Sequence, residues 1–439
     1  MIYGETEADA RSMDIARYGK FASNREYIKQ TTGQFYSRRF VMTYPNEQLQ
    51  AGRALKKAPA FSAMTNAGCK WGESWGLEVP LMFGPKGFEE TPTLKRSNAF
   101  TEVEKEVRAV REGVGLLDIT GFSRYQISGP NAEKWLNYVL ATKLPQPGKA
   151  RLAVMLAPSG RLKGDLTLFN WGNGVFWLMG SYYLREWHMR WFDDYRDENV
   201  LVEDISDMTV GFAITGPKSR DLLAKLTHED IGNEAMPFLS CREIDIGLIR
   251  AKIGRLSVCG ELGYEINCGA LEHITLREAL LNAGQEYDIK EFGFYAMNSL
   301  RLEKGFGVWS AEFRQDYTPF ETGMDKWIDW NKNDFIGKTN ALKLKNDNTS
   351  SRTIVVIEID SLDADASGYE PLWVAKQKIG FITSGGYGHY LKKSLAMALV
   401  DKRFSKEGTK LKTHIVGEER DAIVIESCPY DPKGLKMRI

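Results

Sequence analysis

The sequence predicts an α+β protein in which two related α+β units are followed by a small β-barrel domain. A strand-like segment that stops at a Gly-Pro pair and leads into a helix occurs twice, at 125–140 and again at 211–226. The last ~95 residues contain short β-rich segments separated by glycine turns, which is typical of a small barrel. A length of 439 residues fits three such units at about 150 residues each.

Composition and charge exclude several classes of protein. The chain has 58 Lys and Arg against 58 Asp and Glu, so it lacks the basic excess expected of a protein that coats nucleic acid. It contains no apolar run of about 20 residues that would span a membrane, and its acidic start does not resemble a signal peptide. The 5 cysteines are scattered and only 5 histidines are present. We therefore expect a cytoplasmic protein without a disulfide framework or a metal site.

The boundaries of the units follow from changes in composition. Residues 1–50 are polar and are expected to form an N-terminal arm outside the core. Residues 51–342 are expected to form the core and 343–439 the barrel domain, because a polar run at 343–350 precedes a new β-rich segment.

Two helices and a hairpin are predicted inside the core. Apolar residues at 103, 107, 110, 114 and 117 recur in steps of three and four, which predicts a helix over 102–117 docked on a core. A hairpin over 152–169 turns at Pro158–Gly160, and an aromatic helix is expected over 182–195.

The hairpin carries a carboxylate into an otherwise apolar strand. Strand alternation is expected to put Asp165 on one face with Lys163 and Thr167, and three leucines on the other. A carboxylate at such a position can orient or deprotonate an amine, since partial burial tunes its pKa. By residue type alone, a solvated strand aspartate or a turn cap is the more common arrangement.

Three further segments carry polar residues. In Cys259–Ile266, two glycines bracket Glu261, so the backbone can approach a flat ligand closely. The Glu261 carboxylate could then accept two hydrogen bonds from the N–H groups of an amino-pyrimidinone edge. A simple turn, with Glu265 as a surface charge, is an equally good interpretation. Residues 296–305 are expected to end a helix at Gly305, where Arg301 complements the helix dipole or contacts a polar ligand. His389, in a glycine-rich segment, is expected to be structural because no nucleophile motif lies nearby.

Taken together, these segments resemble the aminomethyltransferase family, which includes the T-protein of glycine cleavage. The matching blocks follow one another in the family's order: Gly76–Pro80, Glu106–Asp118, Gly129–Ala132, Gly160–Asp165, Gly260–Glu265, Ser299–Gly305, Asp334–Lys338 and Thr383–Gly385. The resemblance implies the aminomethyltransferase folate-binding fold, tetrahydrofolate as the cofactor, and transfer of a one-carbon unit.

The likeness is closer to the C-terminal half of bacterial dimethylglycine and sarcosine dehydrogenases, through Glu90–Ala99, Gly121–Tyr125 and Pro429–Pro432. In those enzymes an N-terminal FAD domain oxidises an N-methyl amine to an iminium, and the folate half captures the one-carbon unit. The segment Asp14–Gly19 is similar to the exit from that FAD domain. The resemblance thus implies a folate half that acts in demethylation of dimethylglycine or sarcosine and uses FAD only through a partner subunit or a missing domain.

The residue roles of the family carry over only onto matching positions. Asp165 matches the catalytic aspartate, and Glu261 matches the pterin-anchoring glutamate. The other implied cofactor-binding residues are Arg301, Tyr430, Met155 and Tyr264.

Two positions depart from the family pattern. Met297 stands where glycine-cleavage proteins often have arginine, which weakens that assignment. Val258 stands where an aromatic residue usually precedes the Gly-Glu turn, which leaves the stacking partner of the pterin open.

Two other functions remain open at this point. The first is a stand-alone tetrahydrofolate-dependent methyltransferase or demethylase that takes a methyl group from a sulfonium or an aryl methyl ether and needs no FAD partner. The second is a non-catalytic folate-binding module. Asp165 argues against the module, because a pure binder needs only Glu261 and the pocket.

Overall fold

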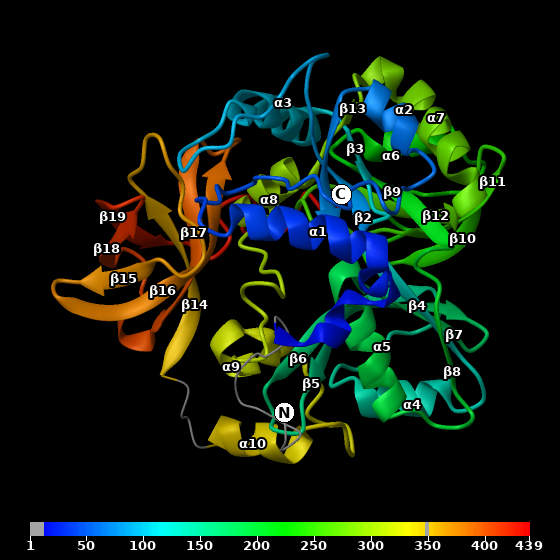
Figure 1. The fold of residues 1–439 in the computed structure, drawn as a ribbon. Helices are drawn as coiled ribbons and strands as arrows, with labels where there is room; N and C mark the ends of the chain where they lie inside the picture. Colours follow the sequence, from blue (N-terminus) through cyan, green and yellow to red (C-terminus); the bar gives the residue numbers. More distant parts are fainter. Residues whose placement is uncertain (1–12, 347–350) are drawn as a thin grey trace.

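Three lobes surround the centre of the protein in the computed structural model, which describes residues 13–346 and 351–439. Figure 1 shows the barrel at the left, a unit built on a six-stranded sheet at the upper right, and a unit built on a five-stranded sheet at the lower right. The predicted α+β architecture with a C-terminal barrel is therefore confirmed.

The first unit is a five-stranded antiparallel sheet in the order β5-β6-β7-β4-β8. Its helices α4 and α5 pack against one face through a core that includes Leu136, Leu166 and Phe192. The strands and helices of this unit are β4 (Phe122–Ser128), β5 (Lys149–Leu156), β6 (Leu162–Gly172), β7 (Val175–Ser181), β8 (Leu201–Asp204), α4 (Ala132–Val139) and α5 (Arg185–Asp194).

The second unit is a six-stranded sheet in the order β10-β11-β12-β9-β3-β13. Helices α6 and α7 share one apolar core with this sheet, whereas α3 and α8 pack against each other and against Leu117 of β3. The elements are β3 (Gly115–Asp118), β9 (Thr209–Thr215), β10 (Cys241–Ile246), β11 (Ile249–Gly254), β12 (Gly263–Gly269), β13 (Lys290–Glu291), α3 (Ala99–Glu112), α6 (Ser219–Ala224), α7 (His273–Gly284) and α8 (Phe294–Glu303).

The internal repeat appears as two equivalent strand-to-helix connections. Strand β4 ends before Gly129 and leads into α4, and β9 ends before Gly216 and leads into α6. Both glycines have positive φ angles, 108° and 133°, and a Cβ atom on either would collide with a backbone carbonyl. Glycine at these two turns is therefore required by the close approach of the chain.

The third lobe is a closed barrel in the order β14-β17-β16-β15-β18-β19. Its interior is filled by aliphatic residues such as Ile357, Leu372 and Ala398. The strands are β14 (Arg352–Ile359), β15 (Pro371–Val374), β16 (Gln377–Gly388), β17 (Lys393–Asp401), β18 (Lys410–Ile415) and β19 (Glu418–Ile425). Two short helices precede it, α9 (Pro319–Thr322) and α10 (Lys338–Asn346). The expected linker at 343–350 is partly helical, and 347–350 lie outside the described residues.

The N-terminal region forms an arm over the core. Helix α1 (Arg25–Arg38) begins where the Asn24 side chain accepts hydrogen bonds from two backbone N–H groups, and none of its residues is buried. Helix α2 (Phe61–Asn66) and the hairpin of β1 (Cys69–Ser74) and β2 (Leu77–Phe83) connect the arm to the core. The part of the expected arm at 1–12 lies outside the described residues.

The helix predicted over 102–117 ends earlier than expected. Helix α3 stops at Glu112, and Leu117 belongs to β3, whose four residues are all buried. The apolar positions 114 and 117 continue the helical spacing by coincidence, because Val114 and Leu117 are buried in and just before the strand and not on a helix face. Within the described chain, no helix is long and apolar enough to cross a bilayer.

Candidate functional site

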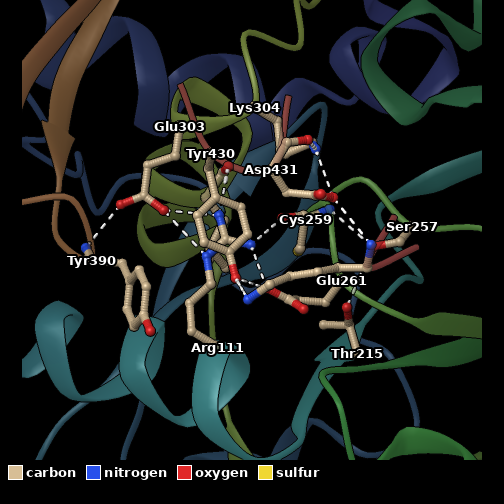
Figure 2. Close-up of polar contacts among 12 residues, drawn as sticks. Arg111, Thr215, Ser257, Cys259, Glu261, Glu303, Lys304, Tyr390, Tyr430 and Asp431 are labelled. Carbon is tan, nitrogen blue, oxygen red and sulfur yellow. Dashed lines mark hydrogen bonds and ion pairs between the residues drawn. The ribbon is translucent and has the colours of Figure 1, made fainter. Parts of the chain in front are cut away.

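A buried network of charged side chains joins the second α+β unit to the barrel and to the C-terminal segment (Figure 2). Arg111, on α3, donates to Glu261 over 3.0 Å and to Glu303 of α8 over 2.8 Å. The side chains of Arg111 and Glu303 are fully buried, and that of Glu261 is 2% exposed. One arginine thus holds two buried carboxylates from distant segments.

The C-terminal segment completes this network. The Tyr430 hydroxyl donates to Glu261, and its ring lies 3.6 Å from the Arg111 guanidinium. Next to it, Lys304 donates to the Asp431 backbone carbonyl over 2.9 Å, with the Asp431 carboxylate at 3.4 Å. Burial, reinforced by the bond to Glu261, raises the pKa of Tyr430, so the phenol stays protonated and acts as a donor.

Glu303 uses both of its carboxylate oxygens in this network, and Glu261 uses one. The second oxygen of Glu303 accepts from the backbone N–H groups of Tyr390 and Leu391, over 2.8 and 3.1 Å. The first oxygen of Glu261 accepts from both Arg111 and Tyr430. The structure thus brings Glu261 and Tyr430 into direct contact, as part of the internal framework.

A different carboxylate faces the cavity between the two α+β units. Glu265 on β12 lines this cavity with the hydroxyl-bearing residues Thr215 and Ser257, whose oxygens are 3.3 Å apart. Its neighbours in the strand, Tyr264 and Ile266, point to the opposite face and lie in the core of the second unit. In the part of the chain that the structure describes, no group donates a hydrogen bond to the Glu265 carboxylate.

The surroundings of Glu265 make its charge adjustable near neutral pH. Burial raises the pKa of Glu265 to about 7, while the positive charge of Arg124 opposes the shift. Arg124 is itself fully buried, and its guanidinium is held by Asn267 and by two backbone carbonyls. A half-buried carboxyl group of this kind beside a fixed cation is typical of ligand-binding sites.

The remaining walls of the cavity are mainly apolar. The aromatic residues are Phe122 and Phe292, and the irregular segment 256–259 covers one side. Val258 in that segment is 37% exposed. The cavity volume is about 10 Å³, room for about one water molecule.

Asp165 lies on β6, half-buried, opposite Val154 of β5. The expected alternation around it is wrong at Lys163. The β5–β6 register shifts between Met155 and Leu156, so Lys163 is an extra residue, and its ammonium lies 3.8 Å from the centre of the Trp187 ring on α5. Because of this bulge, Lys163 is on the helix side of the sheet and does not share the face of Asp165. Asp165 is not among the residues that line the Glu265 cavity.

The other residues of the sequence-predicted site are not gathered around one pocket. Met155 is in the core of the first unit and Tyr264 in that of the second, where its hydroxyl accepts from Arg220. Arg301 ties α8 to the barrel, donating to Ser384 over 2.9 Å with Glu312 at 3.6 Å. Their ligand roles therefore have no direct support from the geometry. His389 is buried, as its expected structural role requires, and burial lowers its pKa to about 4.

Sequence reasoning misses two residues of this region. It treats Glu265 only as a surface charge, although a carboxylate in the middle of a strand with buried neighbours is the signal that could identify it. It places Arg111 inside a family block without a role. The sequence pattern of α3 does not distinguish the buried Arg111 from Arg108, which lies three residues earlier and is partly exposed.

Comparisons with known proteins agree with this architecture. Residues 60–332 match the GCVT N-terminal domain and residues 352–431 the glycine cleavage T-protein C-terminal barrel domain. Residues 3–58 match the FAD dependent oxidoreductase central domain. The aminomethyltransferase T of the glycine cleavage system from Bartonella henselae has a similar fold, with a TM-score of 0.75 and 24% identity over 86% of this chain and 99% of that one. The chain therefore belongs to the folate-dependent aminomethyltransferase family.

The sequence relatives include larger proteins. The mitochondrial dimethylglycine dehydrogenase of Homo sapiens is 31% identical over 97% of this chain and 50% of its own length. The 4-methylaminobutanoate oxidase (formaldehyde-forming) of Paenarthrobacter nicotinovorans is 28% identical over 100% of this chain and 54% of its own length. The chain thus spans about half the length of these relatives.

Proposed function

We propose that this chain transfers a one-carbon unit to tetrahydrofolate in the demethylation of dimethylglycine or sarcosine, as the folate subunit or half of an FAD-linked dehydrogenase. The observation that carries the proposal is Glu265, a half-buried carboxylate without an internal hydrogen-bond donor among the described residues, facing the cavity between the two units. Membership of the folate-dependent family and the similarity to dimethylglycine dehydrogenase support it.

The cavity lining fits a pterin in its chemistry. The amino-pyrimidinone edge of a pterin presents parallel N–H donors, which a carboxylate accepts as two hydrogen bonds. Glu265 supplies this carboxylate, and the hydroxyls of Thr215 and Ser257 can donate to the ring carbonyl. Phe122 and Phe292 provide aromatic surfaces, in place of the aromatic residue that Val258 replaces. We therefore propose that Glu265 contacts the pterin in addition to Glu261, whose implied anchoring role remains part of the proposal.

A pterin needs more room than this cavity of about 10 Å³ offers. The segment 256–259 has no regular hydrogen-bonded structure, and its Val258 is partly exposed. We propose that residues 256–258 move outward to admit the ring, because Cys259 is held by Arg111 through its carbonyl and most other lining residues lie on the hydrogen-bonded strands β3, β4, β9 and β12. Asp165 would then act on the folate amine from the neighbouring sheet.

One assay tests the proposed function. The purified chain is incubated with tetrahydrofolate and dimethylglycine or sarcosine, with and without a flavoprotein partner, and the folate product is identified by mass spectrometry. We expect methylene-tetrahydrofolate only when the partner is present. Methyl-tetrahydrofolate formed by the chain alone from a sulfonium would overturn the proposal, and folate binding without any turnover would indicate a binding module.

The Glu265→Gln variant is expected to bind tetrahydrofolate about 10- to 100-fold more weakly, because a charge-assisted hydrogen bond contributes about 1.5–3 kcal/mol. In the wild-type protein, affinity should fall as the pH is lowered through about 7, where Glu265 becomes protonated. Affinity in the variant should not follow this pH dependence. Isothermal titration calorimetry across this pH range measures both effects.

Two controls separate ligand binding from folding. Glu243→Gln removes an exposed carboxylate of the same sheet, on β10, and should leave folate affinity unchanged.

The raised pKa of Glu265 means that the folded state binds more protons than the unfolded state between pH 4.5 and about 7. Wild-type stability should therefore decrease as the pH rises through this window, relative to Glu265→Gln. Equal affinity of Glu265→Gln and wild type at pH 8 would contradict the assignment.

A further inference from the structure

Helix α1 of the N-terminal arm turns its polar face toward the protein and exposes apolar side chains, the reverse of a normal surface helix. Its inward face consists of Tyr27, Thr31, Gln34 and Arg38, at steps of four, three and four. These residues are held by polar contacts: Gln34 accepts from the backbone N–H of Ala51 over 2.9 Å, and Arg38 pairs with Glu47. Tyr18 and Phe21, before α1, pack against Trp75 and Tyr27, whereas the apolar side chains on the other face of α1 and just after it are exposed.

Exposed apolar side chains recur along α1 and just after it, and we call this set the arm patch. Phe35 is 71% exposed and Phe40 is 89% exposed, although both are large apolar residues. The arm patch consists of Ile28, Phe35, Tyr36, Phe40, Val41 and Met42. Figure 1 shows α1 crossing the front of the protein, outside the three lobes. Exposed apolar surface of this kind marks an interaction site.

The rim of the arm patch is basic. Arg25, Lys29 and Arg39 are exposed beside the patch, against the single carboxylate of Glu26, whereas Arg38 on the inward face is neutralised by Glu47. The Arg39 guanidinium lies 5.3 Å from the Tyr36 ring and 4.7 Å from the Phe40 ring, so it stiffens the patch by cation–π contacts. A matching surface would be apolar at its centre and acidic at its edge.

The sequence of the arm indicates which kind of protein would bind the arm patch. Residues 3–58 match the FAD dependent oxidoreductase central domain, whereas the rest of the chain matches the folate-binding family. The larger relatives are about twice as long as this chain and match it over about half of their length. The arm therefore belongs by sequence to the oxidoreductase part, and the side chains of the arm patch are exposed.

We propose that the arm patch is the docking surface for an FAD-containing oxidoreductase. This inference rests on the proposed function, since it specifies where the flavin partner of that reaction binds. The variant Phe35→Glu/Phe40→Glu introduces two carboxylates into the centre of the arm patch. Leu248→Glu/Leu271→Glu is the matched control, because these leucines are 99% and 97% exposed on the second unit, in the turn of the β10–β11 hairpin and before α7.

The test measures flavin bound per chain. Each tagged full-length chain is purified from the cells that encode it, and FAD is quantified by absorbance and by fluorescence after release. We expect flavin to co-purify with the wild type and the control, and to drop at least tenfold in Phe35→Glu/Phe40→Glu. The double variant should bind tetrahydrofolate as the wild type does, so a folding defect is distinguished from a docking defect.

Three results would overturn the docking proposal. The first is a wild-type chain that carries no flavin, and the second is flavin retained by Phe35→Glu/Phe40→Glu. The third is a wild-type dimer in light scattering that the same variant converts to a monomer, because the arm patch would then bind a second copy of the chain. Failure of the proposed function is recognised separately, because a wild-type chain that binds no tetrahydrofolate would refute that function whether or not flavin co-purifies.

Discussion

Replacing Asp165 by asparagine is expected to slow one-carbon transfer by roughly 10²- to 10⁴-fold, the usual contribution of a positioned general base. When a folate amine attacks an iminium or formaldehyde carbon, the nitrogen gains a bond and must lose its proton. The amide of the variant would keep the shape of the side chain but could not accept that proton. Single-turnover formation of methylene-tetrahydrofolate measures the effect, and calorimetry should show folate affinity within a few-fold of wild type.

The position of Asp165 makes this experiment interpretable. The residue is half-buried in the middle of β6, after the bulge at Lys163, so an isosteric change should not disturb the sheet. Asp360→Asn, an exposed aspartate that follows β14, is the matched control and should retain full activity. If Asp165→Asn lowered binding and transfer by the same factor, the residue would be a binding group only.

Replacing Arg111 by methionine is expected to lower the free energy of unfolding by about 3–5 kcal/mol, the range observed when one partner of a buried ion pair is removed. The substitution leaves Glu261 and Glu303 buried without their common counter-charge. It also removes the cation that lies over the Tyr430 ring. Urea denaturation followed by circular dichroism measures the loss.

The same helix provides a control for this prediction. Arg108 on α3 pairs with Glu104 and Glu112 at the protein surface, and Arg108→Met should leave stability close to the wild-type value. Adding Glu303→Gln to Arg111→Met should cost less than the sum of the single changes, because the neutral amide no longer needs the cation. Strict additivity, or an Arg111→Met variant as stable as wild type, would show that the network is not coupled.

Much of the fold could be predicted from the sequence because local signals and tertiary structure agree. The Gly-Pro turns at 129 and 216, the hairpin turn at Pro158–Gly160 and the β-rich segment after 352 all appear where their residue types indicate. The end of α3 could not be predicted, since a completely buried strand at 115–118 continues the apolar pattern of the helix.

The site was less accessible to sequence reasoning because it depends on which face each residue occupies. Glu261 and Glu265 are four residues apart in one family block, yet the turn directs Glu261 toward Arg111, whereas β12 directs Glu265 toward the cavity. Likewise, a one-residue bulge moves Lys163 away from Asp165. The burial of Arg111 is decided by segments about 150 and 190 residues further along the chain, which no local pattern encodes.

The closing of the central ion network by the C-terminal segment has a consequence for how the protein assembles. Its hydrogen bonds join residues 192 and 169 positions apart, so the loops between them must all close first. During synthesis, the lobes emerge long before Tyr430, and until then Glu261 lacks a donor that it has in the native state. We therefore expect the newly made chain to remain dependent on protection by chaperones until translation has passed the barrel, and to refold slowly from denaturant.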